Sequence, residues 1–108
     1  MLHLNIQGLR DESGWQAAHI ALPRYDVSAM QERTLAHPTW IHFGAGNIFR
    51  AFLAAAQQTL LNAGLTDTGI VAAASHNFHA AAENYVPYDN LSLLVRMHAD
   101  GSCDREVI

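Results

Sequence analysis

The sequence has 108 residues, of which 50% are hydrophobic and 15% are charged, as is typical of one globular domain or of part of a larger one. The formal net charge is −4 and the six basic residues are all scattered arginines, so the concentrated positive face that nucleic acid or an anionic membrane requires is missing. The lack of lysine also excludes a P-loop phosphate site and a Schiff-base mechanism.

Nothing in the sequence indicates export or membrane insertion. Cys103 is the single cysteine and cannot form an internal disulfide, which fits a reducing compartment, and no cationic neighbour marks it as reactive. The first residues lack the basic region and apolar run of a secretory signal. The longest apolar stretch, residues 51–65, is shorter than the ~20 residues of a membrane span. We therefore expect a cytoplasmic protein that binds neither a membrane nor nucleic acid.

Residues 1–38 are mixed in character. They predict two short helices, one starting near Asp11 and one over residues 27–35, with Pro23 between them. We interpret this stretch as an N-terminal helical extension that serves in packing or as part of a substrate lid.

From residue 39 onward the pattern predicts a strand, a glycine turn, a helix and a second strand. The short bulky run at 40–43 is typical of a buried strand. Apolar residues then recur every three or four positions until Gly64, which suits the left-handed position after a helix. The apolar run at 70–74 is typical of a parallel strand covered on both faces. Together these elements form a βαβ unit of the usual ~30 residues.

The remaining residues predict a short helix over 77–83 and then a β-hairpin. Alternation from Leu91 to Met97 indicates one strand, residues 99–102 a turn, and residues 103–108 the returning strand.

The turn between the first predicted strand and helix is the stretch that indicates a function. Gly44 permits a sharp turn, and Gly46 lets a ligand approach the backbone without a side chain in the way. Amides at the start of a helix, together with the positive end of its dipole, bind the diphosphate of a dinucleotide. We predict that seven residues face these phosphates: Gly44, Ala45, Gly46, Asn47, Ile48, Phe49 and Arg50. The predicted fold class is accordingly α/β, a partial and truncated Rossmann-like dinucleotide-binding fold over residues 39–108.

Two features depart from the usual G-x-G-x-x-G pattern. Phe49 takes the place of the third glycine, which normally permits close packing of helix on strand. The acidic residue that usually binds the ribose 2′-hydroxyl after the second strand is also missing, because Ala74, Ser75 and His76 lie there. Ser75 and Asn77 are candidates for that hydroxyl and His76 for a 2′-phosphate, so the preference for NAD over NADP is weak. On spacing alone, a tight turn without a ligand is the alternative.

Other polar and aromatic residues are interpreted as structural. His76 and His79 lack the further ligands that a zinc site needs, so we predict no metal site. His42 is expected to find a hydrogen bond within the strand region. For Asp89-Asn90, contact with the cofactor and capping of a turn are both open. Three aromatic residues are expected to anchor the core: Trp15, Trp40 and Tyr85.

The string HFGAGNIFRAF, residues 42–52, resembles the cofactor turn of the polyol-specific long-chain dehydrogenases, the family of mannitol dehydrogenase and the mannonate and altronate oxidoreductases. In that family a larger residue often replaces the third glycine and an arginine commonly follows, as Phe49-Arg50 do here. Residues 22–26, 87–91 and 100–101 are also similar, so the likeness covers the chain from about residue 20 to its end.

The resemblance implies hydride transfer between a polyol or sugar acid and a nicotinamide cofactor, with NAD expected and NADP as the alternative. The family's lysine, asparagine and histidine lie in a K-x4-N-x2-H pattern on a C-terminal domain, and no stretch here matches that pattern. We therefore assign no catalytic residue and expect the chain alone to be inactive. The expected function is that of the N-terminal cofactor-binding part of such an oxidoreductase. A non-catalytic nucleotide-binding or interaction module and a truncated remnant are the alternatives.

Overall fold

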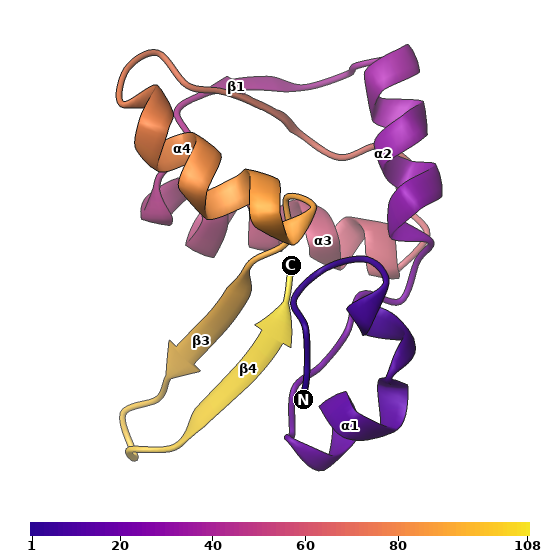
Figure 1. Ribbon diagram of the computed structural model, residues 1–108, viewed down its shortest axis with the longest axis vertical. Coiled ribbons are helices and arrows are strands. Elements are labelled where there is room, and N and C mark those ends of the chain that lie inside the picture. The colour runs from indigo at the N-terminus through magenta and orange to yellow at the C-terminus, as the bar shows by residue number, and fades with distance from the viewer.

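The computed structural model describes residues 1–108 (Figure 1). Its elements in chain order are a 3₁₀ turn at Gly8–Arg10, α1 at Glu12–Ala17, α2 at Val27–Ala36, β1 at Ile41–Phe43, a π-helical segment at Phe49–Ala54 that continues into α3 at Ala55–Asn62, β2 at Val71–Ala73, α4 at Phe78–Tyr85, a 3₁₀ turn at Val86–Tyr88, β3 at Leu93–Met97 and β4 at Cys103–Val107.

The strands form two separate two-stranded sheets. β1 and β2 are parallel, with Ile41 opposite Val71 and Phe43 opposite Ala73, and the π-helical segment with α3 connects them. β3 and β4 form an antiparallel hairpin whose register places Met97 opposite Cys103. The α/β class, the βαβ unit and the hairpin are thus confirmed.

The parallel sheet and the hairpin lie at opposite ends of the molecule. In Figure 1, β1, β2 and helices α2, α3 and α4 form the upper part, whereas the hairpin and the N-terminal segment with α1 form the lower part. The strand ends that lead into the glycine turn and into α4 lie together at the upper left. This arrangement brings the turn after β1 close to α4.

The main hydrophobic core lies between the N-terminal segment and the hairpin. It consists of Trp15, Val27, Leu91 and Val107, and apolar residues of the first 25 positions pack around it. Trp15 is only 4% exposed, and its indole N–H donates to the carbonyl of Gly8 at 2.9 Å. Trp15 is therefore a core anchor, as predicted.

Trp40 and Tyr85 do not share this role. Both side chains are only partly buried and lie outside the core cluster. Trp40 immediately precedes β1, which lies at the other end of the molecule from the hairpin that forms one side of the core. The prediction that these two aromatic residues anchor the core is wrong.

Two consecutive buried glutamines of α3 form hydrogen bonds to distant segments, and one of them joins the upper and lower parts. The side-chain amide of Gln58 in α3 donates to the carbonyl of Val107 in β4 at 2.7 Å, and its oxygen accepts from the Tyr25 hydroxyl at 2.9 Å. Gln57 donates to the carbonyl of Thr68, in the loop before β2, at 2.7 Å. Helix α3 therefore holds both the hairpin and the loop before β2 through buried hydrogen bonds.

α3 ends as the sequence predicts. Gly64 has φ +71°, which favours glycine, and the Leu65 amide donates back to the carbonyl of Leu60 at 3.0 Å. This C-terminal cap directs the chain toward β2.

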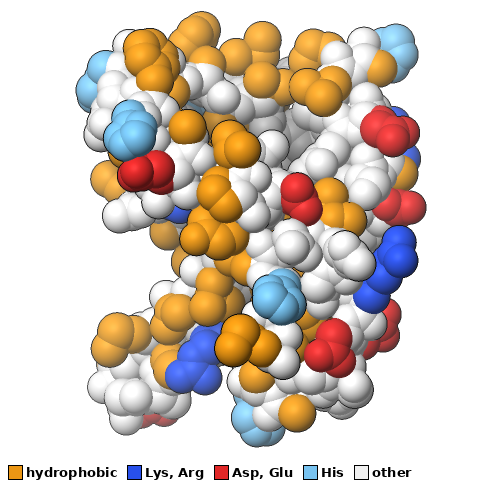
Figure 2. All heavy atoms as spheres, in the orientation of Figure 1, with side chains coloured by type: hydrophobic (Ala, Val, Ile, Leu, Met, Phe, Trp, Pro, Cys, Tyr) orange, Lys and Arg blue, Asp and Glu red, His pale blue; other side chains and the backbone are white.

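The parallel sheet has an open face. Ile41 is 54% and Phe43 77% exposed, and Figure 2 shows hydrophobic side chains gathered along the top of the molecule, over β1. Ala72 of β2 is exposed as well, so the expectation that this strand is covered on both faces is wrong for the residues present. The accessible surface is 7214 Å², whereas a folded protein of 11.8 kDa exposes about 5,900 Å². None of the helices has the length and apolar character needed to cross a membrane.

Tyr25 gives the fold a pH dependence at high pH. Burial, aided by the carboxylate of Glu106, raises the pKa of Tyr25 from 10.0 to about 12. Because the folded chain holds the phenol proton more tightly than the unfolded chain does, this contribution to stability is complete below pH 10 and is lost as the pH rises toward 12. We expect the free energy of unfolding to fall more steeply over this range in the wild type than in Tyr25→Phe. Urea denaturation of both proteins at a series of pH values measures this, and parallel profiles would contradict it.

Candidate functional site

The glycine turn, defined as residues 44–50, connects β1 to the helical segment. The Gly44 amide donates to the carbonyl of Ala73 at 2.8 Å, which extends the pairing of β1 with β2 by one bond. Gly44 has φ +121°, a conformation that side-chain-bearing residues rarely adopt, so glycine is required there. The chain then enters a helix at Asn47. The predicted role of Gly44 in permitting the sharp turn agrees with this geometry.

Gly46 lies open to solvent. It is exposed, and a Cβ atom at this position would meet no other heavy atom within 4 Å. Its φ is not positive, so the backbone conformation at this position does not require glycine. What the glycine provides is free space above the backbone.

Five consecutive amides of the turn are unused. The N–H groups of residues 45–49 donate no hydrogen bond within the chain, and the first helical bond from the turn is donated by Arg50 to the carbonyl of Gly46 at 3.2 Å. No acidic residue occurs in the sequence between Glu32 and Asp67. Free amides, the positive end of a helix dipole and the lack of local negative charge are features that anion-binding helix starts share.

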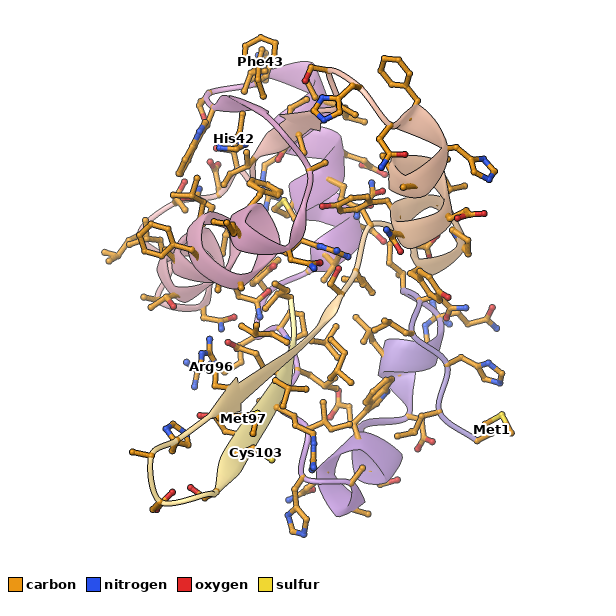
Figure 3. All side chains as sticks on the ribbon, turned by 90° about the vertical axis from the view of Figure 1, so that its left-hand side faces the viewer. Met1, His42, Phe43, Arg96, Met97 and Cys103 are labelled. Carbon is orange, nitrogen blue, oxygen red and sulfur yellow. The ribbon has the colours of Figure 1, made fainter.

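Phe49 packs where the usual pattern has a third glycine. Its side chain is 8% exposed and stacks on the ring of His42, with ring centroids 4.8 Å apart and an interplanar angle of 23°. In Figure 3, His42 lies below β1 on the inner side and Phe43 projects outward at the top. The wide π-helical segment begins at Phe49. An aromatic pair therefore fills the space between strand and helix that a glycine would close.

These contacts determine what His42 and Phe49 can do. The Nδ1 atom of His42 lies 3.0 Å from the carbonyl oxygen of Gly44, so the predicted local hydrogen bond of His42 is confirmed. Only the backbone amide of Phe49 is available to a ligand, because its side chain points into the fold. Of the other residues in the turn, Asn47 and Ile48 have exposed side chains.

Arg50 and Tyr85 pack on the inner side of the turn. The Arg50 guanidinium donates to the Asn47 side-chain oxygen and lies 5.4 Å from the centroid of the Tyr85 ring. The Tyr85 hydroxyl donates to the carbonyl of Ala45 at 2.8 Å. Burial raises the pKa of Tyr85, and the positive charge of Arg50 partly offsets this. Sequence reasoning missed this contact, because Tyr85 is 40 residues from Ala45 and no local pattern relates them.

A cavity of about 460 Å³ lies on the Tyr85 side of the turn. Ala45, Arg50 and Tyr85 are among its lining residues, and most of the other lining residues are apolar. Gly46 does not line this cavity, so the open space above Gly46 is separate from it.

The residues after β2 are exposed, as a ribose-binding position requires. The Ser75 hydroxyl lies 3.2 Å from Nδ1 of His76, and both side chains are exposed. His79 pairs with Glu83 at 3.0 Å. The side chains of histidine, cysteine, aspartate and glutamate form no group of three that could hold a metal ion.

Asp89 and Asn90 have a structural role in the fold. The Asp89 carboxylate accepts a hydrogen bond from the Ile6 amide at 2.9 Å, and the main-chain carbonyl of Asp89 accepts one from the Gln31 side chain at 2.9 Å. Both residues have positive φ, 53° and 64°, as in a tight turn. These contacts favour the turn-capping interpretation of the pair over cofactor contact.

Comparisons with known proteins agree on one class of enzyme. No protein-family model matches the sequence. D-mannonate oxidoreductase of Thermotoga maritima is 36% identical over 107 residues, which are 99% of this chain and 20% of that protein. The crystal structure of a D-sorbitol dehydrogenase in substrate-free form matches with a TM-score of 0.68 and 28% identity, over 84% of this chain and 18% of that one. The chain thus spans about a fifth of the length of these relatives.

Proposed function

We propose that this chain, whose sequence and fold fit the N-terminal part of the mannitol dehydrogenase and mannonate oxidoreductase family, binds the diphosphate of a nicotinamide dinucleotide for an oxidoreductase that acts on a polyol or sugar acid. The observation that carries the proposal is the row of free amides at residues 45–49, with open space above Gly46.

The βαβ unit supports a Rossmann-type site. In such folds the dinucleotide lies across the carboxyl ends of parallel strands, and its diphosphate lies at the start of the helix that follows the first strand. The glycine turn has that position after β1, and Ser75 and His76 have the corresponding position after β2. We propose that the turn holds the diphosphate and that Ser75 lies at the adenosine ribose, which favours NAD as the cofactor.

The bound nicotinamide would supply the hydride acceptor or donor for the reaction. The residues of this chain hold the dinucleotide, and the open space above Gly46 is where its diphosphate lies. Because the chain has no lysine, we propose that the family's general base lies outside these 108 residues and expect no turnover of mannitol or fructuronate by the chain itself.

Titration of the 108-residue chain with NADH tests the proposal. We expect a saturable change in nicotinamide fluorescence that ADP-ribose, which retains the diphosphate, reverses and adenosine does not. A parallel titration with NADPH measures the preference between the two cofactors. Absence of saturation with both NADH and NADPH would contradict cofactor binding, whether by an enzyme part or by a non-catalytic module.

A further inference from the structure

We propose that Tyr85 is a positioning residue that directs the Gly46 amide toward the diphosphate. This inference rests on the proposed function of the glycine turn and adds a residue of α4 to it. The contact that carries it is the 2.8 Å hydrogen bond from the Tyr85 hydroxyl to the carbonyl of Ala45.

The geometry of one peptide unit connects this hydrogen bond to the ligand side of the turn. The Ala45 carbonyl and the Gly46 amide belong to the same peptide, which is planar and trans, so they point in opposite directions. A carbonyl held toward Tyr85 therefore places the Gly46 N–H on the side away from α4. That N–H has no acceptor in the chain, and the space above Gly46 is open.

The orientation of this peptide unit depends on a side-chain hydrogen bond, because no main-chain hydrogen bond of the helix fixes it. No main-chain amide donates to the Ala45 carbonyl, and the first helical bond of the turn goes to the carbonyl of Gly46 instead. Glycine at position 46 lets the peptide rotate at little steric cost. In the rotated state a carbonyl oxygen would face the anion in place of an N–H, which is repulsive. The Tyr85 hydroxyl selects the binding orientation before the ligand arrives.

Arg50 keeps the Tyr85 ring in place. Its guanidinium lies 5.4 Å from the ring centroid and is itself tied to the side chain of Asn47. Through these two contacts Arg50 connects the Tyr85 ring to the turn on its inner side. Tyr85, Arg50 and Ala45 form one connected group that lines the apolar cavity.

The test compares Tyr85→Phe with Tyr25→Phe in the 108-residue chain. Each variant loses one hydroxyl that donates a hydrogen bond, to Ala45 at 2.8 Å and to Gln58 at 2.9 Å respectively. We expect Tyr85→Phe to bind ADP-ribose and NADH roughly tenfold more weakly, because the lost hydrogen bond no longer orients the Gly46 amide. Tyr25→Phe should retain wild-type affinity, and the unfolding midpoint of each variant is measured in urea.

A spectroscopic readout separates orientation from general damage. In ¹⁵N-labelled wild type, ADP-ribose should shift the Gly46 amide resonance strongly and the Gly64 amide little, and Tyr85→Phe should reduce the Gly46 shift at saturation. If the wild type binds neither ligand, the proposed function fails and this inference fails with it. If the wild type binds and Tyr85→Phe matches it in affinity and in the Gly46 shift, the positioning role alone is overturned. Equal losses of affinity in both variants would also overturn it.

Discussion

Gly46→Leu is expected to abolish dinucleotide binding while the chain stays folded. The position has no positive φ and no heavy atom within 4 Å of its would-be Cβ, so a side chain there costs little in strain or steric overlap. The leucine would instead occupy the space in which the diphosphate approaches the free amides of residues 45–49. Loss of two charge-assisted hydrogen bonds, at about 1.5–3 kcal/mol each, weakens binding by roughly 100-fold or more.

NADH and ADP-ribose titrations measure this effect, and urea denaturation confirms that the fold persists. Ala56→Leu provides the control, because it also places a leucine side chain at an exposed position, in α3 beyond the turn. The control should bind as the wild type does. Retention of wild-type affinity by Gly46→Leu would show that the amides of the turn are not the ligand site.

The elements that the sequence predicts correctly are those whose signals are local. Gly44 and Gly64 mark the two ends of the helical connection because their positive φ values favour glycine, whatever lies elsewhere in the chain. Alternation in residues 91–97 and the turn at 99–102 specify the hairpin in the same way. The position of the glycine turn follows from these elements, since it is the segment between a strand and a helix.

The misassigned residues are those whose environment depends on distant segments. Tyr85 reads as a core aromatic residue, but it meets the Ala45 carbonyl through a contact 40 residues away in sequence. Because apolar runs are usually buried, the sequence predicts that Trp40 and β2 are covered. In this chain no element covers the outer face of the parallel sheet, and Ile41 and Phe43 are exposed with it.

The packing of the helix after the turn also could not be predicted from the local sequence. Phe49 departs from the glycine pattern in sequence, which signals altered packing, but the sequence does not specify a stacked His42 partner or a π-helical segment. Gln57 and Gln58 read as polar interruptions of an apolar stretch. Both are buried, at 8% and 3% exposure, because their amides satisfy carbonyl groups that other segments bring to them.

Gln58→Leu tests whether this buried amide joins the two parts of the molecule. The leucine fits the size of the site but leaves the Val107 carbonyl and the Tyr25 hydroxyl without the partners that now lie at 2.7 and 2.9 Å. Each unsatisfied buried group costs about 1–3 kcal/mol, so we expect the free energy of unfolding to fall by roughly 2–6 kcal/mol. Urea denaturation measures the loss, with Gln16→Leu on the exposed surface of α1 as the matched control.

The loss of stability in Gln58→Leu should not add to the loss caused by Tyr25→Phe. Because the Tyr25 hydroxyl donates to Gln58, removing that hydroxyl in Gln58→Leu removes one of the two unsatisfied groups. The double variant Tyr25→Phe/Gln58→Leu should therefore be no less stable than Gln58→Leu alone. An additive double variant would mean that the two side chains act independently, and a Gln58→Leu variant as stable as the control would mean that α3 holds the hairpin by apolar packing alone.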